Sequence, residues 1–138
     1  MTVEVYRKSI PTEGNGHILD ITREVADAVA DCSLTSGLAT VFVTGSTASV
    51  TTVEYEPGLV ADLEEAFDRL YPRDKPYRHH ETWGDDNGHS HVRATMLGPS
   101  LSVPFVDSRL LLGTWQQVVL IDFDTSPRQR EYVVQILG

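Results

Sequence analysis

The sequence has a single cysteine, Cys32, and no long apolar run. One cysteine cannot form a disulfide within the chain, so no oxidising compartment is predicted. No apolar stretch reaches the roughly 18 residues of a membrane-spanning helix, and no membrane partner is expected. The amino-terminal residues MTVEVYRKSI lack the basic and apolar segments of a secretory signal, so we expect a cytoplasmic protein.

Positive charge is scarce, because 11 lysines and arginines stand against 20 aspartates and glutamates, a formal net charge of −9 at pH 7. Proteins bind the phosphates of duplex nucleic acid through basic surfaces that release counterions. An acidic chain would mostly repel that backbone, so no nucleic acid is expected as a partner. An acidic balance otherwise favours solubility, and local clusters of carboxylates can hold metal ions.

Several motifs of common enzyme sites are missing. There is no GxGxxG for dinucleotides, no GxxxxGKS/T for nucleotide phosphates, and no HExxH or CxxC for zinc. No GxSxG motif surrounds any serine, so a serine hydrolase is not predicted. Any chemistry must therefore come from residues in another arrangement.

The 138 residues have the length and composition of one domain spanning residues 1–138, with 41% hydrophobic and 22% charged residues. Apolar residues recur at helical spacing over residues 25–32 and again over residues 59–70. Thr22 is the predicted amino-terminal cap of the first helix, and Pro72 ends the second.

Strand patterns dominate the rest of the chain. LATVFV at residues 38–43 is typical of a buried strand, and residues 45–56 are rich in β-branched side chains. SLSVPFV, LLLGTWQQVVLIDF and REYVVQIL predict three or four closing strands without the strand–helix alternation of a parallel sheet. We therefore predict an α+β fold: a single compact domain of mostly antiparallel sheets with two or three helices.

Four of the five histidines lie within thirteen positions of a polar segment, at His79, His80, His89 and His91. Neutral imidazoles are common zinc ligands, and three protein ligands with a water make an open catalytic site. On a strand His89 and His91 would share one face, whereas in a short helix from residue 89 to 97, which the pattern slightly favours, they would diverge. Alternatively, these histidines lie on the surface of a polar loop without any ligand.

Two aspartates follow the apolar residues near the end of the chain. Asp122 and Asp124 alternate with Ile121 and Phe123, so both carboxylates are predicted to share the face opposite the apolar one. They can bind a metal ion, act as acid or base, or simply meet solvent. Arginines such as Arg93 can clamp phosphate, although arginines at turns and strand ends are more often solvated or paired.

Three segments together closely resemble the YjbQ-like family: YRH at residues 77–79, DNGHSHVRATMLGPSLSVP at residues 86–104, and RLLLGTWQQVVLIDFD at residues 109–124. The similarity spans nearly the whole chain, and the order and spacing of LGxS, proline and GTWQ are specific. The family is associated with secondary thiamine-phosphate synthase activity, in which a pyrimidine diphosphate is joined to a thiazole phosphate.

The resemblance implies a compact α+β homotrimer with sites near subunit boundaries and weak thiamine-phosphate synthase activity on a small phosphorylated molecule. His79 matches the histidine of the family's YxH motif, and His91 matches the histidine that precedes LGxS. Asp122 stands where an acidic residue usually follows GTWQ, so these three residues are the implied catalytic set. Trp115 and Gln116 match the GTWQ pair and are expected to line the substrate pocket.

The chain departs from the family pattern after the first buried strand. Many relatives carry His-Thr-Ser or His-Thr-Thr where this chain has Gly45, Ser46 and Thr47. We expect Ser46 and Thr47 to bind substrate together with Arg93. The usual histidine is missing, which leaves room for His89 to act as a replacement ligand.

A divalent metal is the expected cofactor, held by His79, His89 and His91. Imidazole ligands favour zinc over magnesium, which prefers carboxylates and phosphate oxygens. Displacing a diphosphate normally calls for magnesium, and no diagnostic magnesium-diphosphate motif is present. Three hypotheses therefore stay open: a thiamine-phosphate synthase-like transferase, a metal-assisted hydrolase of a small phosphorylated or amide substrate, and a non-catalytic trimer that binds metal or ligand.

Overall fold

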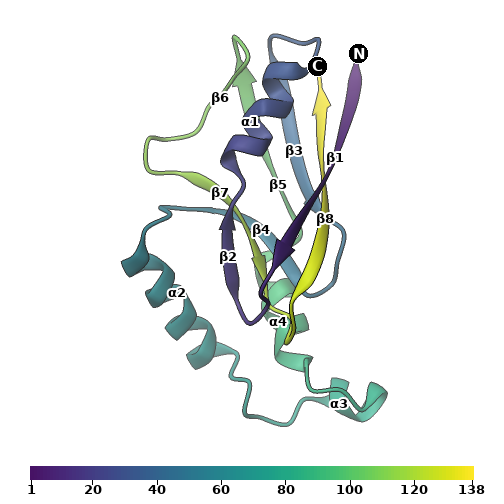
Figure 1. The fold of residues 1–138 in the computed structure, drawn as a ribbon, viewed down its shortest axis with the longest axis vertical. Helices are drawn as coiled ribbons and strands as arrows, with labels where there is room; N and C mark the ends of the chain where they lie inside the picture. The colour runs from purple at the N-terminus through teal and green to yellow at the C-terminus, as the bar shows by residue number, and fades with distance from the viewer.

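Eight strands and four helices follow one another in the computed structural model, which describes residues 1–138 (Figure 1). The strands are β1 (Val3–Thr12), β2 (His17–Asp20), β3 (Gly37–Val43), β4 (Ala48–Val53), β5 (Ser100–Val106), β6 (Arg109–Leu110), β7 (Gln117–Asp122) and β8 (Arg128–Leu137). The helices are α1 (Thr22–Asp31), α2 (Pro57–Leu70), α3 (Arg78–Trp83) and α4 (Gly88–Leu97). The predicted α+β class is confirmed, with four helices instead of two or three.

The strands form two antiparallel sheets. One has the order β1-β8-β3-β5-β6 and the other β2-β7-β4. The two chain ends lie side by side in Figure 1, because Thr2 and Gly138 exchange backbone hydrogen bonds at the edge of the larger sheet. None of the helices has the length and apolar character needed to span a membrane.

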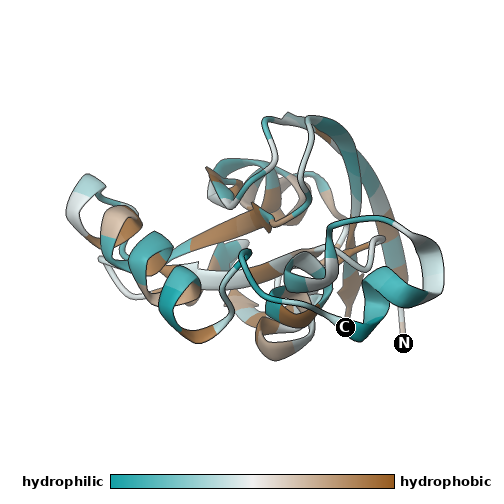
Figure 2. Ribbon diagram, turned by 90° about the horizontal axis from the view of Figure 1, so that it is seen from below, coloured by the Kyte–Doolittle hydropathy of each residue, from teal (hydrophilic) through white to brown (hydrophobic).

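Strand β7 separates two hydrophobic cores. Val118 and Leu120 belong to a core of 16 buried residues that α1 and the larger sheet also line, whereas Val119 and Ile121 belong to a second core of six. A strand that is buried on both faces needs a continuous apolar run, which explains the sequence VVLI. Phe67 of α2 joins the second core, and Figure 2 shows α2 alternating between hydrophilic and hydrophobic segments, as an amphipathic helix does.

The predicted cap of α1 is wrong. Thr22 lies inside the helix, and Asp20 Oδ1 accepts hydrogen bonds from the Thr22 backbone N–H at 2.9 Å and from its hydroxyl at 2.6 Å. The Thr22 hydroxyl oxygen in turn accepts a hydrogen bond from the backbone N–H of Val118 on β7, at 2.9 Å. Asp20 and Thr22 flank Ile21, the residue at the cap position, and both are favoured cap types, so residue type alone does not choose between them.

Two segments differ from the predicted strand and loop pattern. The polar connection after α2 contains a short helix, α3, which carries no apolar periodicity that could have revealed it. In the predicted strand LLLGTWQQVVLIDF, Leu110 ends β6 and the residues from there to Gln117 form a loop. A turn in this loop is closed by a hydrogen bond from the Gln116 backbone N–H to the Gly113 carbonyl at 3.1 Å. The short helix predicted after Asn87 is confirmed as α4.

Candidate functional site

Helices α3 and α4 meet at a close contact that sets the position of the histidines. A Cβ atom at Gly88 would lie 2.5 Å from Cβ of Tyr77, so only glycine permits this approach. The Gly88 backbone N–H donates to Nε2 of His80 at 3.3 Å, and the Tyr77 hydroxyl donates to the carbonyl of Pro72 at 2.6 Å. The first turn of α4 is therefore held against α3 from several directions.

His79 of α3 and His91 of α4 form a stacked pair. Their ring centroids are 4.3 Å apart and the ring planes are inclined by 37°. Burial, with a smaller contribution from His79, lowers the pKa of His91 below the usual value for histidine, which keeps its imidazole neutral at pH 7. Nδ1 of His79 lies 3.0 Å from Oδ1 of Asp85, within ion-pair distance, although it makes no hydrogen bond.

His89 lies apart from this pair. Residues two positions apart on an α-helix diverge by about 200°. The charged groups that shift the pKa of His89 include Arg93, Arg73 and Asp86. Those that shift the pKa of His91 include a different set: His79, Asp124 and Asp85. Only 3% of His89 is exposed, and burial lowers the pKa of its imidazole first, followed by Arg93. The structure therefore brings together two of the three predicted metal ligands.

A metal centre is not assembled within one chain. No group of three or more histidine, cysteine, aspartate or glutamate side chains is placed to hold an ion. Within one chain the His89 ring lies beside Tyr77 and not beside the His79–His91 pair, so its role as a replacement ligand stays a prediction. Three protein ligands define a catalytic zinc site, so the residues present do not fit one.

Unpartnered polar atoms concentrate at the amino-terminal end of α4. Four buried side-chain atoms in the whole chain lack a hydrogen-bond partner, and three of them are His79 Nδ1, Asn87 Oδ1 and His89 Nδ1. Buried polar groups are normally paired, because an unpaired one costs about 1–3 kcal/mol. Only His79 belongs to the stacked pair and lines a cavity, so the three atoms gather around the start of α4 without marking one pocket.

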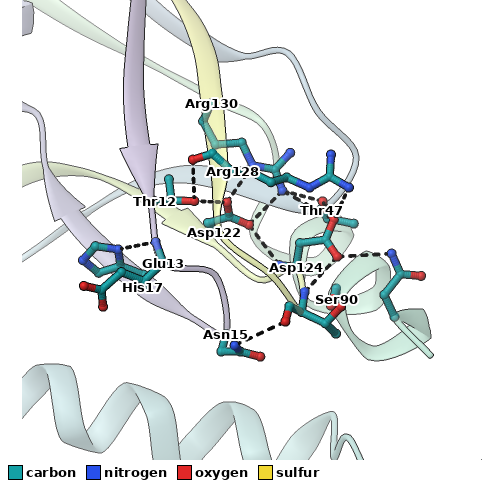
Figure 3. A network of polar contacts seen from close by, with 12 residues as sticks. Thr12, Glu13, Asn15, His17, Thr47, Ser90, Asp122, Asp124, Arg128 and Arg130 are labelled. Atoms are coloured by element: carbon teal, nitrogen blue, oxygen red, sulfur yellow. Dashed lines mark hydrogen bonds and ion pairs between the residues drawn. The ribbon is translucent and has the colours of Figure 1, made fainter. Parts of the chain in front are cut away.

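Asp122 is not available as an acid or base. Its carboxylate is fully buried and is gripped by Arg130, whose Nε donates to Oδ2 at 2.9 Å and whose Nη2 donates to Oδ1 at 2.8 Å (Figure 3). Burial alone would raise the pKa of Asp122, but hydrogen bonds from Arg130 and Thr12 outweigh it and hold the pKa below its usual value. The predicted catalytic role of Asp122 is replaced by a structural ion pair.

Asp124 connects this ion pair to α4. One carboxylate oxygen accepts a hydrogen bond from the Thr47 hydroxyl at 3.0 Å and lies 2.9 Å from Nη2 of Arg128. The other accepts a hydrogen bond from the Asn87 amide at 3.3 Å. Sequence reasoning missed Asn87 as a site residue, and its only signal was its place directly before α4.

Arg93 and Thr47, both predicted to bind substrate, make their hydrogen bonds to other groups of the protein. Nε of Arg93 donates to the carbonyl of Tyr71 at 3.0 Å, and Nη2 of Arg93 donates to Oδ1 of Asp68 at 3.0 Å, which fixes α4 to the end of α2. The Thr47 hydroxyl is buried between Asp124 and Arg130, as Figure 3 shows. Ser46 lines a cavity, and its role in substrate binding stays a prediction.

Two cavities meet at His91. The first, of about 500 Å³, is bordered by two cationic side chains, those of Lys75 and Arg78. It is lined by Lys75, Pro76, Tyr77, Arg78, His79, Gly88, His91 and Val92. The second, of about 520 Å³, is mostly apolar. It is lined by Phe42, Val43, Gly45, Ser46, Ala48, His91, Ala94, Thr95 and Pro99. His91 therefore borders a basic compartment on one side and an apolar compartment on the other.

The GTWQ residues lie far from the histidines within one chain. Trp115 is 72% exposed, and Nε2 of Gln116 donates to Oγ1 of Thr52 at 3.1 Å. In the β4–β7 ladder, Val53 pairs with Gln117 at one end and Ala48 with Asp122 at the other, a separation of about 17 Å at the usual rise per strand residue. One chain cannot bring both groups to the same small substrate.

Proteins similar to this chain are found in archaea and share most of its length. The chain matches the family model described as UPF0047 protein YjbQ-like over residues 7–138. A UPF0047 protein of Methanothermobacter thermautotrophicus is 33% identical, over 99% of this chain and 94% of that protein. A UPF0047 protein of Archaeoglobus fulgidus is 35% identical, over 94% of this chain and 98% of that protein.

Solved structures show the same fold. A YbjQ-like protein of unknown function from Sulfolobus solfataricus superposes with a TM-score of 0.89 at 30% identity, over 99% of both chains. A hypothetical protein from Aeropyrum pernix superposes with a TM-score of 0.90 at 32% identity, over 98% of both chains. The chain therefore belongs to the UPF0047, YjbQ-like family, as the resemblance in its sequence predicted.

Proposed function

We propose that this chain is a cytoplasmic, transferase-like enzyme that acts on small phosphorylated molecules at the His79–His91 pair. The observation that carries the proposal is the stacked imidazole pair at the border of two cavities, with a His91 whose pKa is lowered by burial. Perturbed titratable groups next to a cavity are a physical mark of functional sites.

The basic cavity suits a phosphorylated substrate. Lys75 and Arg78 border it together with the stacked pair, and both carry positive charge at neutral pH. A neutral His91 can accept a proton from a reacting group. Beside it stands His79, whose Nδ1 lies 3.0 Å from Oδ1 of Asp85.

The reaction that we propose first is thiamine-phosphate synthesis, the activity implied by the family resemblance. A thiazole phosphate displaces diphosphate from a pyrimidine diphosphate, so negative charge develops on the leaving group. Lys75 and Arg78 would stabilise that charge. The route needs no carboxylate beyond Asp85, which accords with the commitment of Asp122 to Arg130.

The neutral state of His91 also favours a second candidate, hydrolysis of a small phosphorylated substrate. An imidazole that stays unprotonated at pH 7 can take the proton of an attacking water. A divalent ion, zinc in preference to magnesium, would require a third ligand from the substrate or a second chain, because one chain supplies only two. The proposed base role of His91 therefore does not require a metal.

We also propose that the chain works as a homotrimer. On the outer face of the larger sheet, Val3, Leu137, Leu38 and Pro104 are consecutive cross-strand partners and form an apolar row over four strands. Val3 and Leu38 are exposed in the single chain, as is Trp115 at the far end of the β4–β7 ladder. Association would cover this row and can carry a neighbour's Trp115 and Gln116 toward the histidine pair.

The double variant His79→Asn/His91→Asn tests the function. Product formation from the two thiamine precursors should fall by about 10²–10⁴-fold, the usual contribution of acid–base groups. The remote variant His17→Asn, on β2, serves as the matched control and should keep full turnover. Unchanged turnover in the double variant, with an unfolding midpoint like that of the wild type, would refute the site.

The same purified protein distinguishes the hydrolase alternative from the transferase. Phosphate release from a panel of small phosphate esters, without coupling of thiamine precursors, would favour hydrolysis over transfer. Elemental analysis of the purified protein should accompany this assay, because stoichiometric zinc that the double variant loses would support a metal-assisted reaction. Stoichiometric metal without any turnover would instead favour a non-catalytic binding trimer.

A further inference from the structure

The second cavity differs from the basic one in the charge of its walls. No lysine, arginine, aspartate or glutamate lines it, whereas Lys75 and Arg78 border the basic cavity. Charged residues make up 22% of the chain, so a cavity of about 520 Å³ without one is a distinct environment. An ionised group that enters it loses hydration without gaining a counter-charge, which is costly. The second cavity therefore favours an uncharged group over a phosphate.

Two flat apolar side chains form part of the wall. Phe42 of β3 and Pro99, which follows α4, both line the cavity. Phe42 is 42% exposed, although phenylalanine is among the most often buried residues, and its ring packs against no other aromatic ring. Aromatic rings gain stability from stacked or edge-to-face aromatic partners. The unpartnered Phe42 ring thus favours an aromatic ligand over an aliphatic one.

The inner wall of this cavity consists of small side chains. Ala48 of β4 and Ala94 of α4 line it and are almost completely buried. The strand and the helix are joined at this point, because the Ser49 hydroxyl donates a hydrogen bond to the Ala94 carbonyl at 3.0 Å. The two methyl groups are therefore held on packed elements, and the space between them and Phe42 is preformed, as ligand cavities usually are.

Two polar side chains complete the lining on which a ligand can orient. The Ser46 hydroxyl makes no hydrogen bond within the protein, unlike the hydroxyls of Thr44 and Thr47 on either side of it. His91 supplies an imidazole at the border with the basic cavity. A hydroxyl and an imidazole can each donate or accept, which matches the nitrogen atoms of a heterocycle better than a plain hydrocarbon ring.

We propose that the second cavity binds an uncharged aromatic heterocycle that belongs to the substrate, while the phosphate of the same molecule lies in the basic cavity. His91 lines both cavities, so it stands at the junction between ring and phosphate. The inference rests on the proposed function, because it names the part of a phosphorylated substrate by which this chain selects it. Phosphate is common to all such substrates, so only the ring can distinguish them.

Methyl groups of alanine report on the cavity by NMR. Titration at pH 7 with 4-aminopyrimidine, an uncharged heterocycle without phosphate, should shift the signals of Ala48 and Ala94. The signal of Ala28, in the main core beneath α1, should not shift. Methyl phosphate carries the anion without a ring and should leave all three signals unchanged. Shifts of Ala48 and Ala94 with methyl phosphate, or none with 4-aminopyrimidine, would overturn the proposal.

Two neighbouring positions of α4 provide a matched pair of variants. Thr95 lines the cavity and Met96 does not, and both side chains are exposed. Thr95→Trp fills the space and should weaken binding of 4-aminopyrimidine by about tenfold or more, whereas Met96→Trp should bind it as wild type does. Phe42→Ala removes the stacking ring and should weaken binding by about two- to tenfold. An unchanged dissociation constant in folded Thr95→Trp would sink the subsite, and Phe42→Ala decides if that variant unfolds.

Turnover distinguishes this proposal from the proposed function. His79→Asn should lower turnover and keep 4-aminopyrimidine binding, because His79 does not line the second cavity. Ring binding in a wild-type protein that turns over no phosphorylated substrate would reject the proposed function and retain the subsite. Turnover in wild type without any shift of Ala48 and Ala94 by the ring would have the opposite meaning.

Discussion

Individual side chains of this protein have roles that depend on what lies across from them in space. Asp122 has the sequence setting of an exposed carboxylate, alternating with Ile121 and Phe123, yet it is fully buried against Arg130. The alternation correctly indicates a strand, but β7 is covered on both faces, so neither face meets solvent. Arg130, eight residues further along the chain and on another strand, pairs with this carboxylate and gives it a structural role.

Asp122→Asn should destabilise the protein by about 3–5 kcal/mol, because it leaves the buried Arg130 without its counter-charge. Chemical denaturation at pH 7 measures the loss in the free energy of unfolding. Asp62→Asn, on the exposed face of α2, is the control and should change stability by less than about 0.5 kcal/mol. A loss of similar size in both variants would contradict the ion pair.

The same pair predicts an acid-sensitive stability. Burial raises the pKa of Asp122 but its hydrogen bonds lower it further, so the net folded-state pKa lies below the ordinary value of about 4. The stabilisation is then fully present above about pH 4 and is lost as the pH falls through the folded-state pKa. Unfolding measured from pH 7 to pH 2 should show this loss in wild type and a smaller one in Asp122→Asn.

NMR titration of the histidine rings tests the stacked pair. The His91 imidazole should titrate below the usual value of about 6.5, because burial and then His79 lower its pKa. His79→Asn removes the second cause and should raise the pKa of His91 part of the way back. A His91 pKa that is unchanged by this variant would show that the rings are apart in solution.

At the scale of elements, the decisive feature is that residues after Asn87 form a helix. His89 and His91 would share a face on a strand, but on α4 one ring turns toward Tyr77 and the other toward His79. The sequence favours this helix through Asn87 and the Gly98–Pro99 stop, and the structure confirms it. Helix α3 has no such signal, because its six residues are too few to show a period.

Gly88→Ala should separate the two helices. The added methyl would lie 2.5 Å from the Tyr77 side chain, and overpacking of this kind costs about 1–3 kcal/mol. Because Tyr77 precedes α3 directly, the displacement should pull His79 from His91 and lower turnover together with stability. Thr82→Ala, on the exposed side of α3, is the control for both measurements. Full turnover in Gly88→Ala would mean that the contact does not position the pair.

At the scale of the whole molecule, the proposed site residues lie in two places that are far apart within one chain. The histidine pair lies at one end of the β4–β7 ladder and the GTWQ loop at the other. A homotrimer in which each site takes its loop from a neighbour removes this difficulty, and the exposed apolar row supplies a surface for association.

Subunit complementation tests this arrangement. His79→Asn/His91→Asn and Trp115→Ala/Gln116→Ala should each be inactive alone, and refolding them together should restore part of the turnover, because mixed trimers contain intact shared sites. Leu38→Glu should in addition place a charge in the apolar row and reduce the mass in solution from about three times 15.3 kDa to that of one chain. Absence of complementation, with trimers that do mix, would contradict shared sites.

Local chemistry determined much of this protein. The alternation and apolar runs specify strands, the turn residues separate them, and the spacing of YRH, LGxS and GTWQ identifies the family, because these signals act between residues near one another in the chain. Partners distant in sequence were decided by the tertiary structure alone: Arg130 against Asp122, His79 against His91, and Gly45 beneath a guanidinium. Such contacts arise when two cores and two sheets pack simultaneously, and no local pattern encodes which distant side chain arrives opposite another.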